Sequence, residues 1–164
     1  TTPDLLDVEL FRQNFQDEYV LIFKHHPFVK ERPEIPVDSE RFAKDFTDDM
    51  AIEELLIVSD ICISDYSSLI FEYSLFERPM IFFAYDIDEY YDWRGFYYNF
   101  KDFVPGPIYY DNESMVKYIS DVEKNFDRQQ VIAFREKYMS ACDGQTTKRI
   151  MKLVFEDRLE DYRR

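Results

Sequence analysis

Hydroxyl and carboxylate side chains gather in the segment "SDYSS", residues 64–68, between two apolar runs. The run "ICIS" is short and β-branched, which predicts a buried strand, and "LIFEYSLF" has helical spacing. The first amides of a helix lack intrahelical partners and carry the positive end of its dipole. Ser67 and Ser68 beside those amides would form a cradle for a phosphate group. Ordinary capping of the helix by Ser64 or Asp65 explains the same residues.

Three further side chains have the chemistry to serve such a site. His26 precedes Pro27 after an apolar run, and its imidazole would donate to a phosphate oxygen or, if protonated, stabilise a leaving group. Glu72 lies about one turn beyond Ser68 and would accept hydrogen bonds from ribose hydroxyls. Arg94, beside a glycine, suits contact with a phosphate from a loop. A surface histidine in a turn, an exposed helix charge and a loop ion pair are the respective alternatives.

The surrounding sequence predicts the elements that position these residues. Apolar runs at 19–23, 61–64 and 80–85 predict strands buried on both faces, and "RFAKDFT" and "PIYYD" predict shorter strands. Helical spacing occupies 4–15, 48–58, 66–77, 112–126, 128–140 and 146–162. This alternation predicts a Rossmann-like α/β domain, with a parallel sheet and helices on both faces. Ligands bind beyond the carboxyl ends of such strands, where His26 and residues 64–68 would lie.

Composition excludes several other classes of protein. The formal net charge of −14 argues against a broad basic surface for nucleic acid. No window approaches the roughly 18 uninterrupted apolar residues of a membrane-spanning helix. The two cysteines lack metal-ligand spacing, which predicts reduced thiols. The acidic runs lack the glycine and ligand pattern of an EF-hand. We therefore expect no bound metal. A chain of 164 residues suits one domain with a full core, so we expect residues 1–164 to form a single domain.

Several ordered segments together resemble one known family. These are "KHHPF", "SDICISDYSSLIFEYSLFERPMIFF", "YDIDEYYDWRGFYYNF", "VPGPI" and "DGQTTKRI". The set is similar to the C-terminal half of the bacterial CDP-glycerol glycerophosphotransferases, the teichoic-acid polymerases and primases. The resemblance runs from about residue 19 to 153 and implies the C-terminal, donor-binding domain of a GT-B-type transferase. Its N-terminal acceptor domain would lie outside this chain.

The resemblance also implies roles for individual residues. Ser67 and Ser68 would hold the pyrophosphate of a CDP-polyol and Glu72 its ribose. His26 would lie near the reacting phosphate as the catalytic residue, and Arg94 would reach over the cleft. The remaining expected donor contacts are Lys24, Pro27, Thr47, Ser64 and Asp65.

The implied reaction transfers glycerol phosphate from CDP-glycerol to a teichoic-acid-like or surface-polysaccharide acceptor and releases CMP. An acceptor hydroxyl would attack the β-phosphate, with catalysis by positioning and charge neutralisation and without a cofactor. The chain alone should bind nucleotide but transfer little. The full enzyme would be cytoplasmic and peripheral at the inner membrane face, with acceptor and membrane contacts made by the missing half. Two alternatives stay open: a GT-B-type transferase using a nucleotide sugar, and a non-catalytic interaction module.

Overall fold

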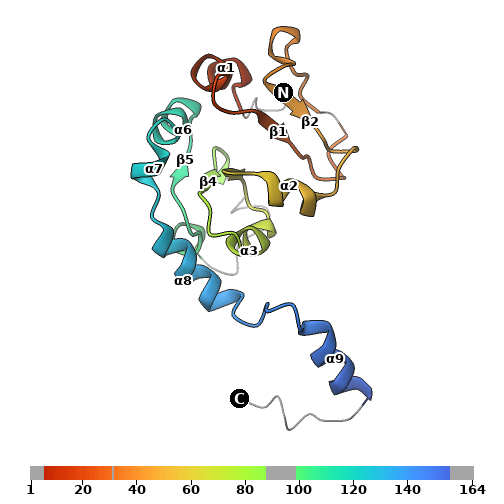
Figure 1. The fold of residues 1–164 in the computed structure, drawn as a ribbon. Coiled ribbons are helices and arrows are strands. Elements are labelled where there is room, and N and C mark those ends of the chain that lie inside the picture. The colour runs from red at the N-terminus through yellow and green to blue at the C-terminus, as the bar shows by residue number, and fades with distance from the viewer. Residues whose placement is uncertain (1–5, 31, 88–98, 156–164) are drawn as a thin grey trace.

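The structure is a computed structural model that describes residues 6–30, 32–87 and 99–155. Its strands are β1 (Leu21–Phe23), β2 (Ala43–Asp45), β3 (Cys62–Ser64), β4 (Met80–Phe83) and β5 (Ile108–Tyr109). Its helices are α1 (Val8–Phe15), α2 (Ile52–Val58), α3 (Leu69–Ser74), α5 (Phe100–Phe103), α6 (Asn112–Ile119), α7 (Val122–Asn125), α8 (Arg128–Tyr138) and α9 (Thr146–Phe155), with one 3₁₀ turn at Val37–Ser39. The predicted alternation of strands and helices is confirmed (Figure 1).

All the strand pairs that the structure describes are parallel. β1 pairs with β2, with Ile22 opposite Lys44, and the second sheet has the order β3-β4-β5, with Ile63 opposite Ile81. The sequence predicted one sheet, whereas the hydrogen-bonded ladders form two. Phe42 and Ala43, at the start of β2, nevertheless share one core cluster with Ile81 and Phe83 of β4. The two sheets therefore belong to one folded body.

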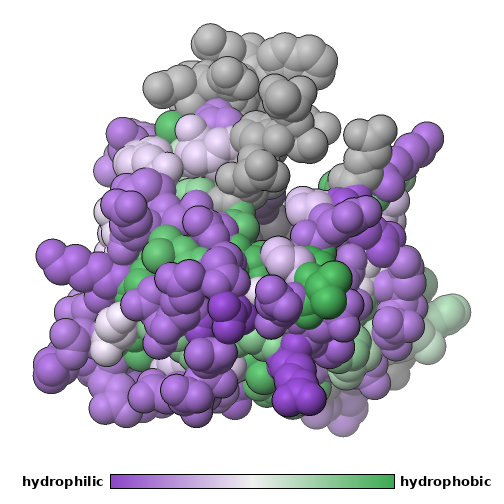
Figure 2. Space-filling view, turned by 90° about the horizontal axis from the view of Figure 1, so that it is seen from above, coloured by the Kyte–Doolittle hydropathy of each residue, from purple (hydrophilic) through white to green (hydrophobic). Residues whose placement is uncertain are grey.

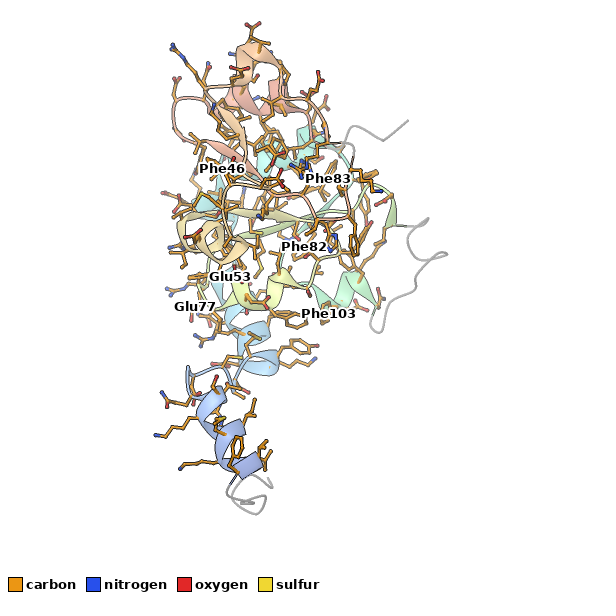
Figure 3. The ribbon with its side chains drawn as sticks, turned by 90° about the vertical axis from the view of Figure 1, so that its right-hand side faces the viewer. Phe46, Glu53, Glu77, Phe82, Phe83 and Phe103 are labelled. Carbon is orange, nitrogen blue, oxygen red and sulfur yellow. The ribbon has the colours of Figure 1, made fainter. Side chains whose placement is uncertain are left out.

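The central strand β4 is buried on both faces, as its uninterrupted apolar sequence predicts. Met80, Phe82 and Ala84 contribute to one core cluster, whereas Ile81 and Phe83 contribute to the other. This alternation is the period of two that a strand imposes on its side chains. Figure 3 labels Phe82 and Phe83, which belong to these two clusters. The strand thus separates two cores.

Helices cover both faces of this strand. α3 and α8 carry Ile70, Tyr73, Val131 and Phe134 into the cluster of Phe82. α1 and α6 carry Phe11, Phe15, Met115 and Ile119 into the cluster of Phe83. The two groups of helices lie on different sides of β4 in Figure 1, so the Rossmann-like fold class is confirmed.

Several helix boundaries differ from the sequence-based prediction. α1 begins at Val8 rather than at residue 4, and Asp7 caps it, because its Oδ1 accepts from the amide of Leu10 at 2.9 Å. α2 begins only at Ile52, since Thr47 is held by contacts to the end of β1. The predicted helix at 112–126 divides into α6 and α7 around Ser120, whose hydroxyl bonds back to the carbonyl of Val116.

The surface is mostly polar. Figure 2 shows hydrophilic residues over much of one face, with smaller hydrophobic patches between them. In the part of the chain that the structure describes, no helix combines the length and apolar character needed to cross a bilayer. α9 stands apart from the other elements in Figure 1 and has no buried residue.

An acidic residue joins the turn after α3 to α8. Glu77 has a left-handed backbone with φ of 54°, and its carboxylate lies 2.5 Å from both Arg128 and Arg135 (Figure 3). Its side chain is only 16% exposed, whereas that of Arg128 is 63% exposed. The ion pair with the less exposed Arg135 should therefore contribute more, because solvent screens the Arg128 pair.

We expect Glu77→Gln to lower the free energy of unfolding by about 1 kcal/mol, because it removes the charge that two guanidinium groups share. Urea denaturation measures the change. Glu136→Gln on the exposed side of α8 is the control and should stay within about 0.5 kcal/mol of the unmodified chain. Equal stability of the two variants would show that this contact does not hold α8.

Candidate functional site

The side chain of Lys24, the residue after β1, is hydrogen-bonded to the backbone of a neighbouring loop. Its Nζ donates to the carbonyls of Thr47 at 2.7 Å and Met50 at 2.5 Å, with a longer contact of 3.5 Å to Phe46. A lysine ammonium has three hydrogens to donate, and all three have partners here. Lys24 therefore holds the loop after β2. Its Nζ could contact a bound ligand only if these hydrogen bonds to the loop carbonyls broke.

Thr47 completes the connection between the ends of β1 and β2. Its hydroxyl accepts from the amide of His25 at 2.9 Å, and its own amide donates to Asp45 at 2.7 Å. Burial raises the pKa of Asp45, but the hydrogen bonds from Thr47 and the charges of His25 and Arg32 outweigh it and lower the pKa overall. Arg32 forms two bonds to Asp48, at 2.6 and 3.1 Å. The side-chain cations of Lys24 and Arg32 thus already have hydrogen-bond partners.

His26 and Pro27 lie in an exposed turn beyond β1. The turn is closed by a hydrogen bond of 2.9 Å from the amide of Val29 to the carbonyl of His26. The His26 Nδ1 accepts from the amide of Phe28 at 3.2 Å, and the two rings meet edge to face with centroids 4.9 Å apart. The imidazole is therefore oriented although it is open to solvent.

The polar segment after β3 combines a capping hydroxyl, an exposed hydroxyl and a buried hydroxyl. Ser67 Oγ accepts from the amide of Leu69 at 3.3 Å, whereas Ser68 is exposed and makes no side-chain cap bond to α3. Ser64 is 7% exposed, and its hydroxyl has no hydrogen-bond partner among the described residues. The alternative in which Ser64 or Asp65 caps the helix is wrong, because the N-cap residue of α3 is Ser68.

Tyr66 stabilises this segment through a hydrogen bond and a ring contact. Its hydroxyl donates to Asp86 Oδ1 at 2.8 Å, beyond the end of β4, and its ring meets Phe100 of α5 edge to face. Burial and the bond to Asp86 raise the pKa of Tyr66 above its usual range, so it stays a neutral donor. The sequence-based reasoning missed this role, although an aromatic residue within a polar segment is a usable signal for such a contact.

The other predicted residues fall in different situations. Asp65 and Glu72 are exposed, and Glu72 lies on α3, which begins beyond Ser68. Arg94 lies outside the described residues. Burial raises the pKa of the Cys62 thiol to about 12, which makes it a poor nucleophile. Of the described residues, no three His, Cys, Asp or Glu side chains gather in a way that would hold a metal ion.

The predicted site residues form two sets of contacts in the structure. One joins Lys24, His25 and Thr47 at the ends of β1 and β2, and the other joins residues 64–68 to α3 and Asp86. A cavity of about 210 Å³ lies elsewhere, where β4 begins at Met80. It is bordered by Gly106, where an added Cβ would lie 2.1 Å from the Met80 carbonyl, so only glycine fits. The carboxyl ends of β1 and β3 are the candidate site because they hold the hydroxyls and the oriented imidazole.

Comparison with known proteins finds sequence similarity to polymerases and transferases of teichoic acids. The sequence profile described as CDP-glycerol:poly(glycerophosphate) glycerophosphotransferase matches residues 2–156. The chain is 39% identical to the teichoic acid poly(ribitol-phosphate) polymerase of Bacillus spizizenii over 93% of this chain and 24% of the relative. It is 33% identical to the teichoic acid glycerol-phosphate transferase of Staphylococcus aureus, over 92% of this chain and 39% of the relative.

Solved structures agree in fold. A variant of the wall teichoic acid polymerase TagF, soaked with CDPG, superposes with a TM-score of 0.80 at 31% identity, covering 98% of this chain and 40% of that protein. TagF itself gives a TM-score of 0.79 over 96% of this chain and 39% of that protein. The chain thus spans between about a quarter and two fifths of the length of these similar proteins.

Lys24→Met should destabilise the domain by about 1 to 3 kcal/mol, because it leaves the carbonyls of Thr47 and Met50 without their donor. Lys44→Met, at an exposed position of β2, is the matched control and should have little effect. Chemical denaturation of both variants measures the difference. A stable Lys24→Met protein would return this lysine to the list of residues free to bind a ligand.

Proposed function

Because the chain belongs to the CDP-glycerol:poly(glycerophosphate) glycerophosphotransferase family, we propose that it binds the CDP-polyol donor of such an enzyme. The nucleotide diphosphate would lie at the carboxyl ends of β1 and β3, where parallel α/β sheets bind ligands. Ser67 and Ser68 are proposed to contact the pyrophosphate, Glu72 the ribose, and His26 the phosphate near the reaction. Arg94, Asp65 and the Pro27 turn are proposed to border the same ligand.

The hydroxyl of Ser64 is the observation that carries this proposal. A buried hydroxyl without a partner costs free energy, about 1 to 3 kcal/mol, unless some group reaches it. Ser64 ends β3 and directly precedes the segment of Ser67 and Ser68, one of which presents an exposed hydroxyl. A phosphate or ribose oxygen would supply the missing hydrogen bond if the segment after β3 moved to expose the buried Ser64 hydroxyl. An unsatisfied buried group in a native structure calls for an explanation, and a catalytic role or a missing bound species is among those known.

The proposed reaction is transfer of a polyol phosphate to an acceptor hydroxyl. The oxygen of that hydroxyl forms a bond to the β-phosphorus while the bond to the bridging oxygen of CMP breaks, and the hydroxyl proton passes to a base. No cofactor is needed for this balance. The acceptor and its base would be supplied by the longer protein, and so would attachment to the inner face of the membrane. This chain contributes donor binding and the orientation of the phosphates.

CDP-glycerol or CDP-ribitol should raise the melting temperature of this chain by about 5 to 10 °C at a ligand concentration of about 100 times Kd. The double variant Ser67→Ala with Ser68→Ala should lose most of this shift, whereas Ser140→Ala, exposed beyond α8, should keep it. UDP- and GDP-sugars belong in the same panel. A shift only with a nucleotide sugar would support the glycosyltransferase alternative, and no shift with any nucleotide would support an interaction module.

Ser64→Ala should change stability and binding in opposite directions. Removing an unpartnered buried hydroxyl should leave the unliganded domain equally stable or more stable, by up to about 1 kcal/mol. The same change should weaken CDP-glycerol binding roughly fivefold, because the donor loses one hydrogen bond. Urea denaturation and titration calorimetry measure the two effects. A loss of stability with unchanged affinity would assign Ser64 to the fold alone.

A further inference from the structure

We infer that the backbone amide of Phe28 fixes the tautomer of His26, so that the neutral imidazole presents Nε2–H outward as a hydrogen-bond donor. Phe28 is then a positioning residue for His26. The identity of the group that receives this hydrogen bond, a phosphate oxygen of the donor, rests on the proposed function. The tautomer itself does not, because it follows from contacts within the turn.

The turn geometry determines which nitrogen carries the proton. The amide of Phe28 donates to His26 Nδ1 at 3.2 Å, and the amide of Val29 donates to the His26 carbonyl at 2.9 Å. His26 is thus the first residue of a β-turn with Pro27 second, where proline is favoured. Its side chain accepts from the third residue, as Asn and Asp commonly do at this position. A neutral imidazole has one N–H and one lone pair, so accepting at Nδ1 leaves the proton on Nε2.

The ring of Phe28 supports the same orientation. It meets the His26 ring edge to face at 4.9 Å and 60°, although it is itself 86% exposed. An apolar side chain so exposed gains little from the core, and its contact is with the imidazole. The ring and the amide of Phe28 therefore both hold His26, and they leave Nε2 as the nitrogen without a contact inside the turn.

The adjacent histidine is held in a different way. The ring of His25 stacks on Phe23 with an interplanar angle of 5°, and its Nε2 lies 4.0 Å from Asp45 Oδ2. Its amide donates to Thr47. His25 thus serves the connection between β1 and β2, and only His26 faces outward. The two neighbouring histidines are therefore held by different contacts.

The tautomer can be measured directly, because the chain contains only two histidines. Imidazole ¹⁵N NMR at about pH 8, above the usual titration range of histidine, separates protonated from unprotonated ring nitrogens. The His25→Gln variant assigns the spectrum by leaving one imidazole. We expect an unprotonated Nδ1 in His26, with a scalar coupling to the Phe28 amide across the hydrogen bond. A protonated Nδ1 would overturn the inference.

Two substitutions distinguish the hydrogen bond from the Phe28 amide to Nδ1 from the outward N–H at Nε2. In His26→Asn the side-chain oxygen can take the place of Nδ1 and keep the Phe28 bond, but nothing replaces Nε2–H. In His26→Gln the amide NH₂ reaches the place of Nε2, but the acceptor for Phe28 is lost. We expect His26→Asn to keep the Phe28 amide protected from hydrogen exchange and to bind CDP-glycerol roughly tenfold more weakly. His26→Gln should show the reverse, with faster exchange at the Phe28 amide and binding closer to that of the unmodified chain.

The outcomes distinguish this inference from the proposed function. Unchanged CDP-glycerol affinity in His26→Asn, while the unmodified chain binds, would overturn the role of Nε2–H as a donor. If the unmodified chain binds no nucleotide, the proposed function falls together with that role. The NMR experiment on the unliganded chain still decides whether Phe28 sets the tautomer.

Discussion

The burial of β4 on both faces is the constraint on which the rest of the fold depends. Ile81 and Phe82 are both fully buried, yet they belong to different core clusters. A strand in this situation needs helices on each side and a parallel partner at each edge, which β3 and β5 supply. The carboxyl ends of β3 and β4 consequently lie side by side, and Tyr66 after β3 can reach Asp86 after β4. The position of the candidate site follows from the core.

Polar groups at the strand ends differ in whether the domain itself satisfies them. Lys24 and Thr47 are fully engaged in joining the loops after β1 and β2, and Ser67 satisfies the first amide of α3. Ser64 and the outward nitrogen of His26 have no such internal role in the described contacts. The first group builds the framework, and the second group is the one proposed to contact a ligand. Residue type alone does not separate them, since each group contains a hydroxyl and a basic side chain.

The sequence predicts those features that depend on local pattern. The continuous apolar run of β4 predicted its burial, and the strand and helix order predicted the fold class. The role of Lys24 was not predictable, because its partners are backbone carbonyls 22 to 26 residues away, which have no sequence signature. The residue that caps α3 was not predictable either, because it depends on the path of the backbone after β3. The assignment of Ser67, Ser68, Glu72 and His26 to parts of a donor came from family resemblance and stays a prediction.

The electrostatics of the described site indicate how a donor would be recognised. A CDP-polyol carries a negatively charged diphosphate, yet Lys24 is bound to carbonyls and Arg32 to Asp48, while Asp65 and Glu72 add negative charge nearby in sequence. Hydroxyls and a neutral imidazole can bind phosphate oxygens through directed hydrogen bonds without supplying charge. Within residues 6–30, 32–87 and 99–155, recognition would therefore depend on neutral donors in fixed orientations. Neutralisation of the departing CMP would then fall to groups outside the described residues, such as the predicted Arg94.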